Sequence, residues 1–140
     1  MQPTIILGGR HSDERGTLRF NNDFNAIPVK RLYVIHNSEV RPIRGWQGHK
    51  VEQRWFMAVE GDYEISVIKV DNWEQPSPHL PAQKFRLSQE KADVLHVPAG
   101  YITAIHALTS ENALLVMSDY RLGEVQDEYR FPLDYFKDIF

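Results

Sequence analysis

The segment RGWQGHKVEQRWF, residues 44–56, concentrates side chains that can do chemistry. Its neighbours alternate like a half-buried strand, and residues two apart on a strand share a face, so Gln47 and His49 should point the same way. An imidazole in a partly dry cavity is suited to removing a proton beside a carbonyl and returning it, and an adjacent amide can donate and accept hydrogen bonds. The same spacing is also typical of a core histidine bonded to a backbone carbonyl, so both interpretations stay open.

Short strands are expected to position this segment, and a long amphipathic helix is absent from the pattern. A hairpin turn at Gly61-Asp62 is predicted to join two strands within 53–70. A proline-rich loop is predicted at 71–81, and one short helix at 132–140, with Pro132 in its first turn. Closely spaced strands with Gly and Pro turns predict an all-β sandwich or small barrel, a single domain over residues 1–140, with a ligand site at the barrel mouth. The predicted strand regions are 31–38, 53–70, 83–88, 93–108 and 111–120.

Composition excludes several classes of function. The 140 residues contain no cysteine, which rules out thiol chemistry and the common cysteine-containing zinc sites, and a reducing cytoplasm is the simplest location. A net charge of −3 argues against nucleic-acid binding, and no apolar run approaches the ~18 residues of a membrane span. Residues 29–50 nevertheless hold five cations against one carboxylate, which suits a small anion, whereas residues 111–140 hold seven carboxylates against three cations. Two such faces could also attract each other between subunits.

Four motifs, in this order, resemble the cupin-fold sugar 3,4-ketoisomerases and WxcM-like proteins, and more distantly the dTDP-4-dehydrorhamnose 3,5-epimerases. They are HSDERGTLRF at 11–20, Arg-Gly-x-x-x-His-Lys at 44–50, VPAGY at 97–101 and SDY at 118–120. The resemblance implies a double-stranded β-helix, a jelly-roll-like barrel, usually a homodimer. It also implies action without a metal or other cofactor on a nucleotide-linked 4-keto-6-deoxy sugar such as a dTDP-4-keto-6-deoxyhexose, by proton transfer through an enolate or enediol intermediate.

The sequence departs from the family pattern at two histidine positions. The family's first motif histidine falls on Gln47 and its second on His49, while Thr103 stands where cupins often place a later histidine. The loss of the first histidine disfavours an epimerase with its usual base, and one surviving ligand of four is too few for a transition-metal site. A single imidazole on one face can still carry out both steps of a 3,4-keto shift. The alternative is a non-catalytic cupin that binds a sugar nucleotide or a subunit partner.

Further roles follow from the resemblance alone. Tyr120 would donate to the sugar or to the developing oxyanion, and its alternative is a barrel-wall tyrosine. Arg15 would meet the diphosphate, and Arg44 the phosphate or enolate oxygen, unless either is a structural ion pair at a strand end. The expected catalytic residues are His49 and Tyr120, and the expected substrate-binding residues are Arg15, Arg44, Gln47, Trp46, Tyr33 and Thr103. Trp46, Tyr33 and Phe20 are candidates for stacking on the nucleotide base, and their alternative is a place in the core. A weaker hypothesis has the aromatic tail at 128–136 capping a partner chain.

Overall fold

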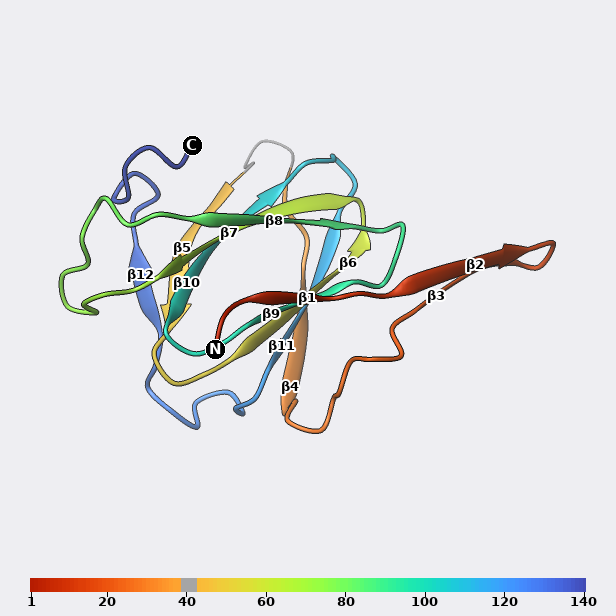
Figure 1. The fold of residues 1–140 in the computed structure, drawn as a ribbon, viewed down its shortest axis with the longest axis horizontal. Coiled ribbons are helices and arrows are strands. Elements are labelled where there is room, and N and C mark those ends of the chain that lie inside the picture. The colour runs from red at the N-terminus through yellow and green to blue at the C-terminus, as the bar shows by residue number, and fades with distance from the viewer. Residues whose placement is uncertain (39–42) are drawn as a thin grey trace.

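The computed structural model describes residues 1–38 and 43–140, and it is all-β, with two five-stranded antiparallel sheets packed face to face in a jelly-roll arrangement (Figure 1). The predicted fold class is therefore confirmed. Arg41 and Glu39, which were counted in the basic segment, lie outside the described residues. The first sheet has the order β1 (Thr4–Ile6), β9 (Val94–Val97), β6 (Arg54–Glu60), β11 (Ala113–Ser118), β4 (Arg31–Ile35). The second has the order β12 (Tyr129–Phe131), β5 (Ile43–His49), β10 (Tyr101–Ala107), β7 (Asp62–Lys69), β8 (Gln83–Ser88).

The core fills the space between the two sheets because inward positions on both are apolar. Tyr63, Ile65 and Val67 of β7 face Phe56 and Leu114 of the first sheet in one buried cluster. Strand β8 lies against β6 and β9, which closes one long side of the sandwich. At the other long side the edge strands are β4 and β12, so any opening between the sheets is expected there.

The outer face of the second sheet is covered by residues from the proline-rich loop and the C-terminal tail. Trp46 of β5 is 1% exposed and packs edge-on against Phe136, with 5.4 Å between the ring centroids. The tail thus packs on its own chain, and β12 pairs with β5. Among the described residues no helix is long and apolar enough to span a membrane.

The prediction of a short helix at 132–140 is wrong, because this segment forms successive turns. Nine residues are too few to form a stable helix without tertiary support. Here the tertiary contacts favour another path: the Lys137 amide donates to the Pro78 carbonyl at 2.7 Å, and the Tyr135 hydroxyl donates to the Pro76 carbonyl. Asp138 has a left-handed φ of 62°, which a helix does not allow.

The strands β2 (Gly9–Asp13) and β3 (Gly16–Phe20) form a hairpin that projects from the sandwich (Figure 1). Its base is attached to the body through Arg19, whose guanidinium donates to the Val59 carbonyl at 3.0 Å and the Gln89 carbonyl at 2.7 Å. The strand break predicted at Gly61 is present, since β6 ends at Glu60, β7 begins at Asp62 and Gly61 has a φ of 74°. The hairpin predicted there is wrong, because β6 and β7 lie in different sheets and do not pair.

Candidate active site

A cavity of about 880 Å³ lies between the sheets, lined mainly by β4, β5, β10 and β12. The cavity lies at the long side of the sandwich whose edge strands are β4 and β12, opposite the side that β8 closes. Cavities of this size accommodate ligands larger than a monosaccharide. Its lining is unusually polar for the interior of a β-sandwich: it includes Arg31, Arg44, Arg54 and Arg130, the carboxylates Glu52 and Glu128, and His36 and His49.

Strand β5 positions Gln47 and His49 on the cavity wall, as their spacing predicts. The intervening Gly48 faces the opposite side, where a Cβ would lie 2.0 Å from Ile102 Cγ2 of β10. Only glycine lets the two strands approach this closely. The neighbouring Trp46 borders the cavity, but its ring belongs to the outer cluster and its indole N–H donates to the Leu133 carbonyl at 3.2 Å.

His49 is 7% exposed, and its Nδ1 lies 3.0 Å from the backbone carbonyl of Asp127. An Nδ1–H that donates to this carbonyl leaves Nε2 without a proton and able to accept one. The ring is therefore bonded to main chain, as the structural interpretation expects, and it also lines the cavity, as a catalytic role requires. Burial, then the Arg54 guanidinium, lowers the pKa of His49 below its usual value, and Glu52 opposes them, so the resting imidazole is neutral at neutral pH.

The carboxylate of Asp127 fixes the turn that follows β5. It is 4% exposed and accepts the backbone N–H groups of Lys50 at 2.8 Å, Val51 at 2.8 Å and Glu52 at 2.7 Å. Three successive N–H groups aimed at one carboxylate form an anion cradle, which here is filled from within the chain. Asp127 thus holds His49 through its carbonyl and the adjoining turn through its side chain.

Glu52 and Arg54 form an ion pair at the floor of the cavity, 2.9 Å between Oε1 and Nη1. The Ser118 hydroxyl donates to the same Oε1 at 3.0 Å. The other oxygen, Oε2, lies 3.6 Å from His49 Nδ1. This places a buried carboxylate and a buried guanidinium beside the imidazole.

His49, Glu52 and Asp127 offer ligand atoms within 4.8 Å of one another, a spacing that could hold a metal ion. Apart from Glu52 Oε2, however, the oxygens of the two carboxylates and His49 Nδ1 are already engaged. Asp127 accepts three N–H groups, Glu52 accepts Arg54 and Ser118, and His49 Nδ1 meets a carbonyl. The adjacent guanidinium would also repel a cation, so these residues do not fit a metal site.

Two guanidiniums in the cavity lack a carboxylate partner among residues 1–38 and 43–140. Arg31 lies over the ring of Tyr33, 4.8 Å from its centroid, and Arg44 makes only a long 3.4 Å contact with Asn37 Oδ1. By contrast Arg130 pairs with Glu128 at 2.9 Å. Unpaired guanidiniums in a cavity are suited to binding phosphate or carboxylate groups.

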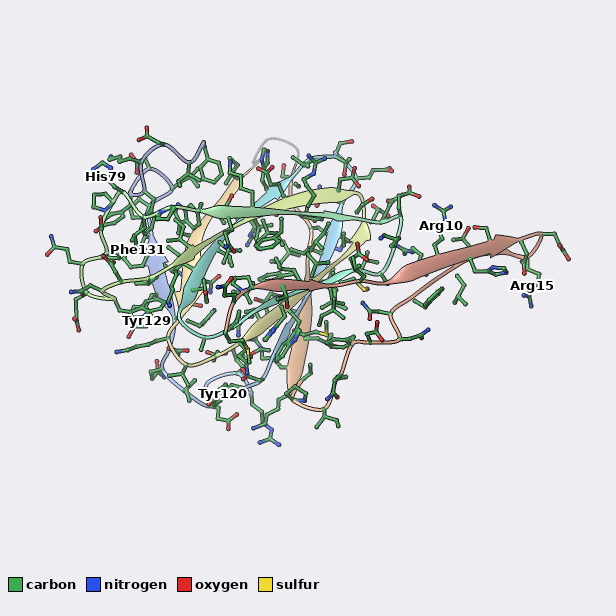
Figure 2. The ribbon with its side chains drawn as sticks, viewed as in Figure 1. Arg10, Arg15, His79, Tyr120, Tyr129 and Phe131 are labelled. Atoms are coloured by element: carbon green, nitrogen blue, oxygen red, sulfur yellow. The ribbon has the colours of Figure 1, made fainter. Side chains whose placement is uncertain are left out.

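Of the eight predicted site residues, the structure brings five together in the cavity, leaves two apart, and places Trp46 at the border with its ring in the outer cluster. Arg15 lies at the tip of the projecting hairpin, where its side chain is 85% exposed and pairs with Asp13 at 2.8 Å (Figure 2). Tyr120 follows β11, beneath the Lys30 ammonium, and is not among the residues that line the cavity. The predicted residues that line the cavity with their side chains are Tyr33, Arg44, Gln47, His49 and Thr103.

Sequence reasoning missed several polar residues of the site. Alternation on β4 does carry a signal for Arg31, because Arg31, Tyr33 and Ile35 face inward while Leu32 and Val34 are exposed. The remaining missed residues gave no local signal: Glu52, Arg54, Asp127, Glu128 and Arg130.

The model of a family described as FdtA: WxcM-like, C-terminal matches residues 1–139. Among curated proteins, none matches the chain in sequence. A mutant of the 3,4-ketoisomerase QdtA from Thermoanaerobacterium thermosaccharolyticum, in complex with TDP-4-keto-6-deoxyglucose, is 19% identical, with a TM-score of 0.70 over 93% of this chain and 88% of that one. The TDP-quinovose 3,4-ketoisomerase WlaRB from Campylobacter jejuni is 19% identical, with a TM-score of 0.68 over 92% of each chain. The RmlC epimerase from Mycobacterium tuberculosis is 14% identical, with a TM-score of 0.73 over 92% of this chain and 68% of that one.

Proposed function

The chain belongs to the WxcM-like, C-terminal family, and from that membership we propose that it is a nucleotide-sugar 3,4-ketoisomerase acting on a dTDP-4-keto-6-deoxyhexose. The observation that carries the proposal is His49, whose Nε2 makes no hydrogen bond to residues 1–38 or 43–140 while Nδ1 is held by a carbonyl at the wall of a cavity of about 880 Å³. The structural neighbours QdtA and WlaRB are sugar 3,4-ketoisomerases, which supports this choice of reaction.

In the proposed reaction Nε2 of His49 removes the proton from the third ring carbon, and the electron pair forms the carbon–carbon double bond of an enediol. The proton of the third carbon's hydroxyl passes to the neighbouring oxygen on the fourth carbon, so the former keto oxygen becomes a hydroxyl and the third carbon's oxygen becomes the keto group. The imidazolium returns its own proton to the fourth carbon. One base on one face of the ring therefore suffices.

Gln47 and Thr103 are suited to orienting the two sugar oxygens, because they pair across β5 and β10 and both line the cavity. The amide nitrogen of Gln47 donates to Glu128 at 2.6 Å, which leaves its carbonyl oxygen to accept from a sugar hydroxyl. Arg31 and Arg44, which have no carboxylate partner among the described residues, would bind the diphosphate.

We further propose a cytoplasmic homodimer in which residues 1–140 act as one domain, without nucleic acid or a metal. Leu32 and Val34 on the outer face of β4 and Leu18 on the hairpin are exposed apolar side chains, and they would favour contact with a second copy. The roles of Arg15 and Tyr120 stay predictions that rest on the family resemblance.

Deuterium wash-in tests the function. We expect incubation with dTDP-4-keto-6-deoxyglucose in heavy water to place label at the third or fourth ring carbon, His49→Asn to abolish labelling, and His79→Asn, in the proline-rich loop, to leave it unchanged. Label at the fifth carbon would indicate an epimerase. Binding without any exchange would instead favour the non-catalytic cupin, which is the alternative supported by Gln47 and Thr103 standing at histidine positions of the family.

A further inference from the structure

The two oxygens of Glu52 serve different partners at the floor of the cavity. Oε1 is held by the Arg54 guanidinium at 2.9 Å and by the Ser118 hydroxyl at 3.0 Å. Oε2 faces His49 Nδ1 at 3.6 Å, too far for a hydrogen bond in the resting state but close for an ion pair. The side chains of Glu52, Arg54 and His49 are all nearly inaccessible to solvent, so the charges act on one another with little screening.

We propose that Glu52 and Arg54 act as an opposed pair on His49: Glu52 Oε2 stabilises the imidazolium that forms when Nε2 takes a proton, and Arg54 keeps the imidazole neutral until then. The proposed function supplies the proton that Nε2 takes, but the coupling of the three side chains does not depend on it. Both residues are positioning residues, because neither gains nor loses a proton and the proton moves only between the sugar carbon and Nε2.

Two other carboxylates lie near the His49 ring, those of Asp127 and Glu128. Asp127 is close, but its carboxylate oxygens accept three backbone N–H groups, so only its carbonyl meets the ring. Glu128, just before β12, is paired with Arg130 and bonded to Gln47. Glu52 is the carboxylate that keeps an oxygen available for the imidazolium among the described residues around the ring.

The geometry also explains why Arg54 is present. A carboxylate alone beside the imidazole would favour the protonated form at rest, and a protonated histidine cannot accept a proton from the substrate. The guanidinium offsets that effect: burial and Arg54 lower the pKa of His49, whereas Glu52 raises it. Because one oxygen of Glu52 is anchored by Arg54 and Ser118, the other stays in place when the ring becomes charged.

The test is an NMR titration of the His49 ring in the unliganded protein, which requires no turnover. We expect Glu52→Gln to lower the pKa of His49 and Arg54→Met to raise it, with the double variant Glu52→Gln/Arg54→Met in between. Glu64→Gln, which removes the carboxylate of an ion pair with Lys84 on the opposite side of the sandwich, is the matched control and should change nothing. If Arg54→Met alone does not fold, the pKa of His49 is compared between Glu52→Gln and the double variant. Arg54→Lys, which keeps the positive charge, should leave the pKa of His49 close to that of the unmodified protein.

Kinetics provide the second readout. With Glu52→Gln, kcat should fall by about tenfold or more while KM changes little, and the acid limb of the kcat profile should move to lower pH; Arg54→Met should move that limb to higher pH. A residue with only a structural role would not shift the two variants in opposite directions. If Glu52→Gln leaves the pKa of His49 unmoved, or if both variants move it the same way, the proposal is wrong. If the unmodified protein shows no turnover, the proposed function fails, and the titration alone still decides the coupling.

Discussion

Replacing Asp127 should both weaken the fold and disturb the site, because one side chain fixes the turn between β5 and β6. Its carboxylate accepts three backbone N–H groups at 2.7–2.8 Å and is 4% exposed. A hydrogen bond to a charged group contributes about 1.5–3 kcal/mol, and the three are not additive because they share one acceptor. Asp127→Ala leaves three N–H groups unsatisfied, so we expect a loss of roughly 3–5 kcal/mol. Asp127→Asn, which keeps one acceptor oxygen, should lose about 2–3 kcal/mol.

Denaturation by guanidinium chloride measures these losses in the free energy of unfolding, and thermal unfolding provides a check. A chain of this length has an unfolding entropy of roughly 0.3 kcal/mol/K at its midpoint, so a loss of about 3 kcal/mol should lower Tm by about 10 °C. The matched control is Asp71→Asn, since Asp71 also accepts two backbone N–H groups, from Asn72 and Ser77, but in an exposed loop. It should cost under about 1 kcal/mol, because water replaces the lost contacts.

The effect on activity separates the two roles of Asp127. Its carbonyl remains in Asp127→Asn, so His49 Nδ1 keeps its acceptor, but the loosened turn no longer fixes Glu52 beside the ring. We therefore expect kcat to fall with little change in KM under conditions where the variant stays folded. A loss of stability no larger than that of Asp71→Asn would refute the reasoning, because it would show that the three N–H groups are satisfied without the carboxylate.

Three further predictions follow from the same geometry. Burial lowers the pKa of both His49 and His96, so below about pH 6.5 the folded protein binds fewer protons than the unfolded chain. The free energy of unfolding, measured in urea, should therefore fall as the pH drops below about 6.5. The double variant His49→Gln/His96→Gln should reduce this dependence on pH. Gly48→Ala should cost about 1–3 kcal/mol in the same assay because its Cβ would collide with the buried Ile102 side chain, whereas Gly45→Ala, with 3.7 Å to its nearest neighbour, should cost less than half as much. Arg31→Met should weaken dTDP binding by roughly tenfold in calorimetry, and unchanged affinity would exclude this guanidinium from the diphosphate site.

The wall of the site that strand β5 supplies could be predicted from the sequence because a strand repeats every two residues. That rule places Gln47 and His49 on one face, and the structure agrees. It also extends across the sheet, since Thr103 pairs with Gln47 in the β5–β10 register. The Gly61 turn was equally local, because a left-handed φ favours glycine.

The other half of the site depends on contacts between distant parts of the chain. Asp127 lies 78 residues from His49, and β12, which follows it, has only three residues and no periodic pattern. In the sequence Asp127 and Glu128 belong to an acidic segment, and nothing local distinguishes a buried carboxylate from a solvated one. The incorrect helix at 132–140 has the same origin, because the aromatic residues of the tail pack on Trp46 and not along one helical face.

The location of the buried charges in this sandwich is itself evidence about function. A buried ion pair such as Glu52–Arg54 seldom stabilises a fold more than apolar side chains of similar size, because desolvation offsets the attraction. On the closed side, where β8 meets β6 and β9, inward positions such as Leu87 and Leu95 are apolar. The buried charges lie next to His49, at the side where β4 and β12 leave the sheets open. An explanation by fold stability alone would have to say why charges are buried at the open side and apolar side chains at the closed side. The proposed proton transfer at His49 accounts for this asymmetry directly, since a proton-carrying imidazole needs neighbouring charges and the apolar core does not.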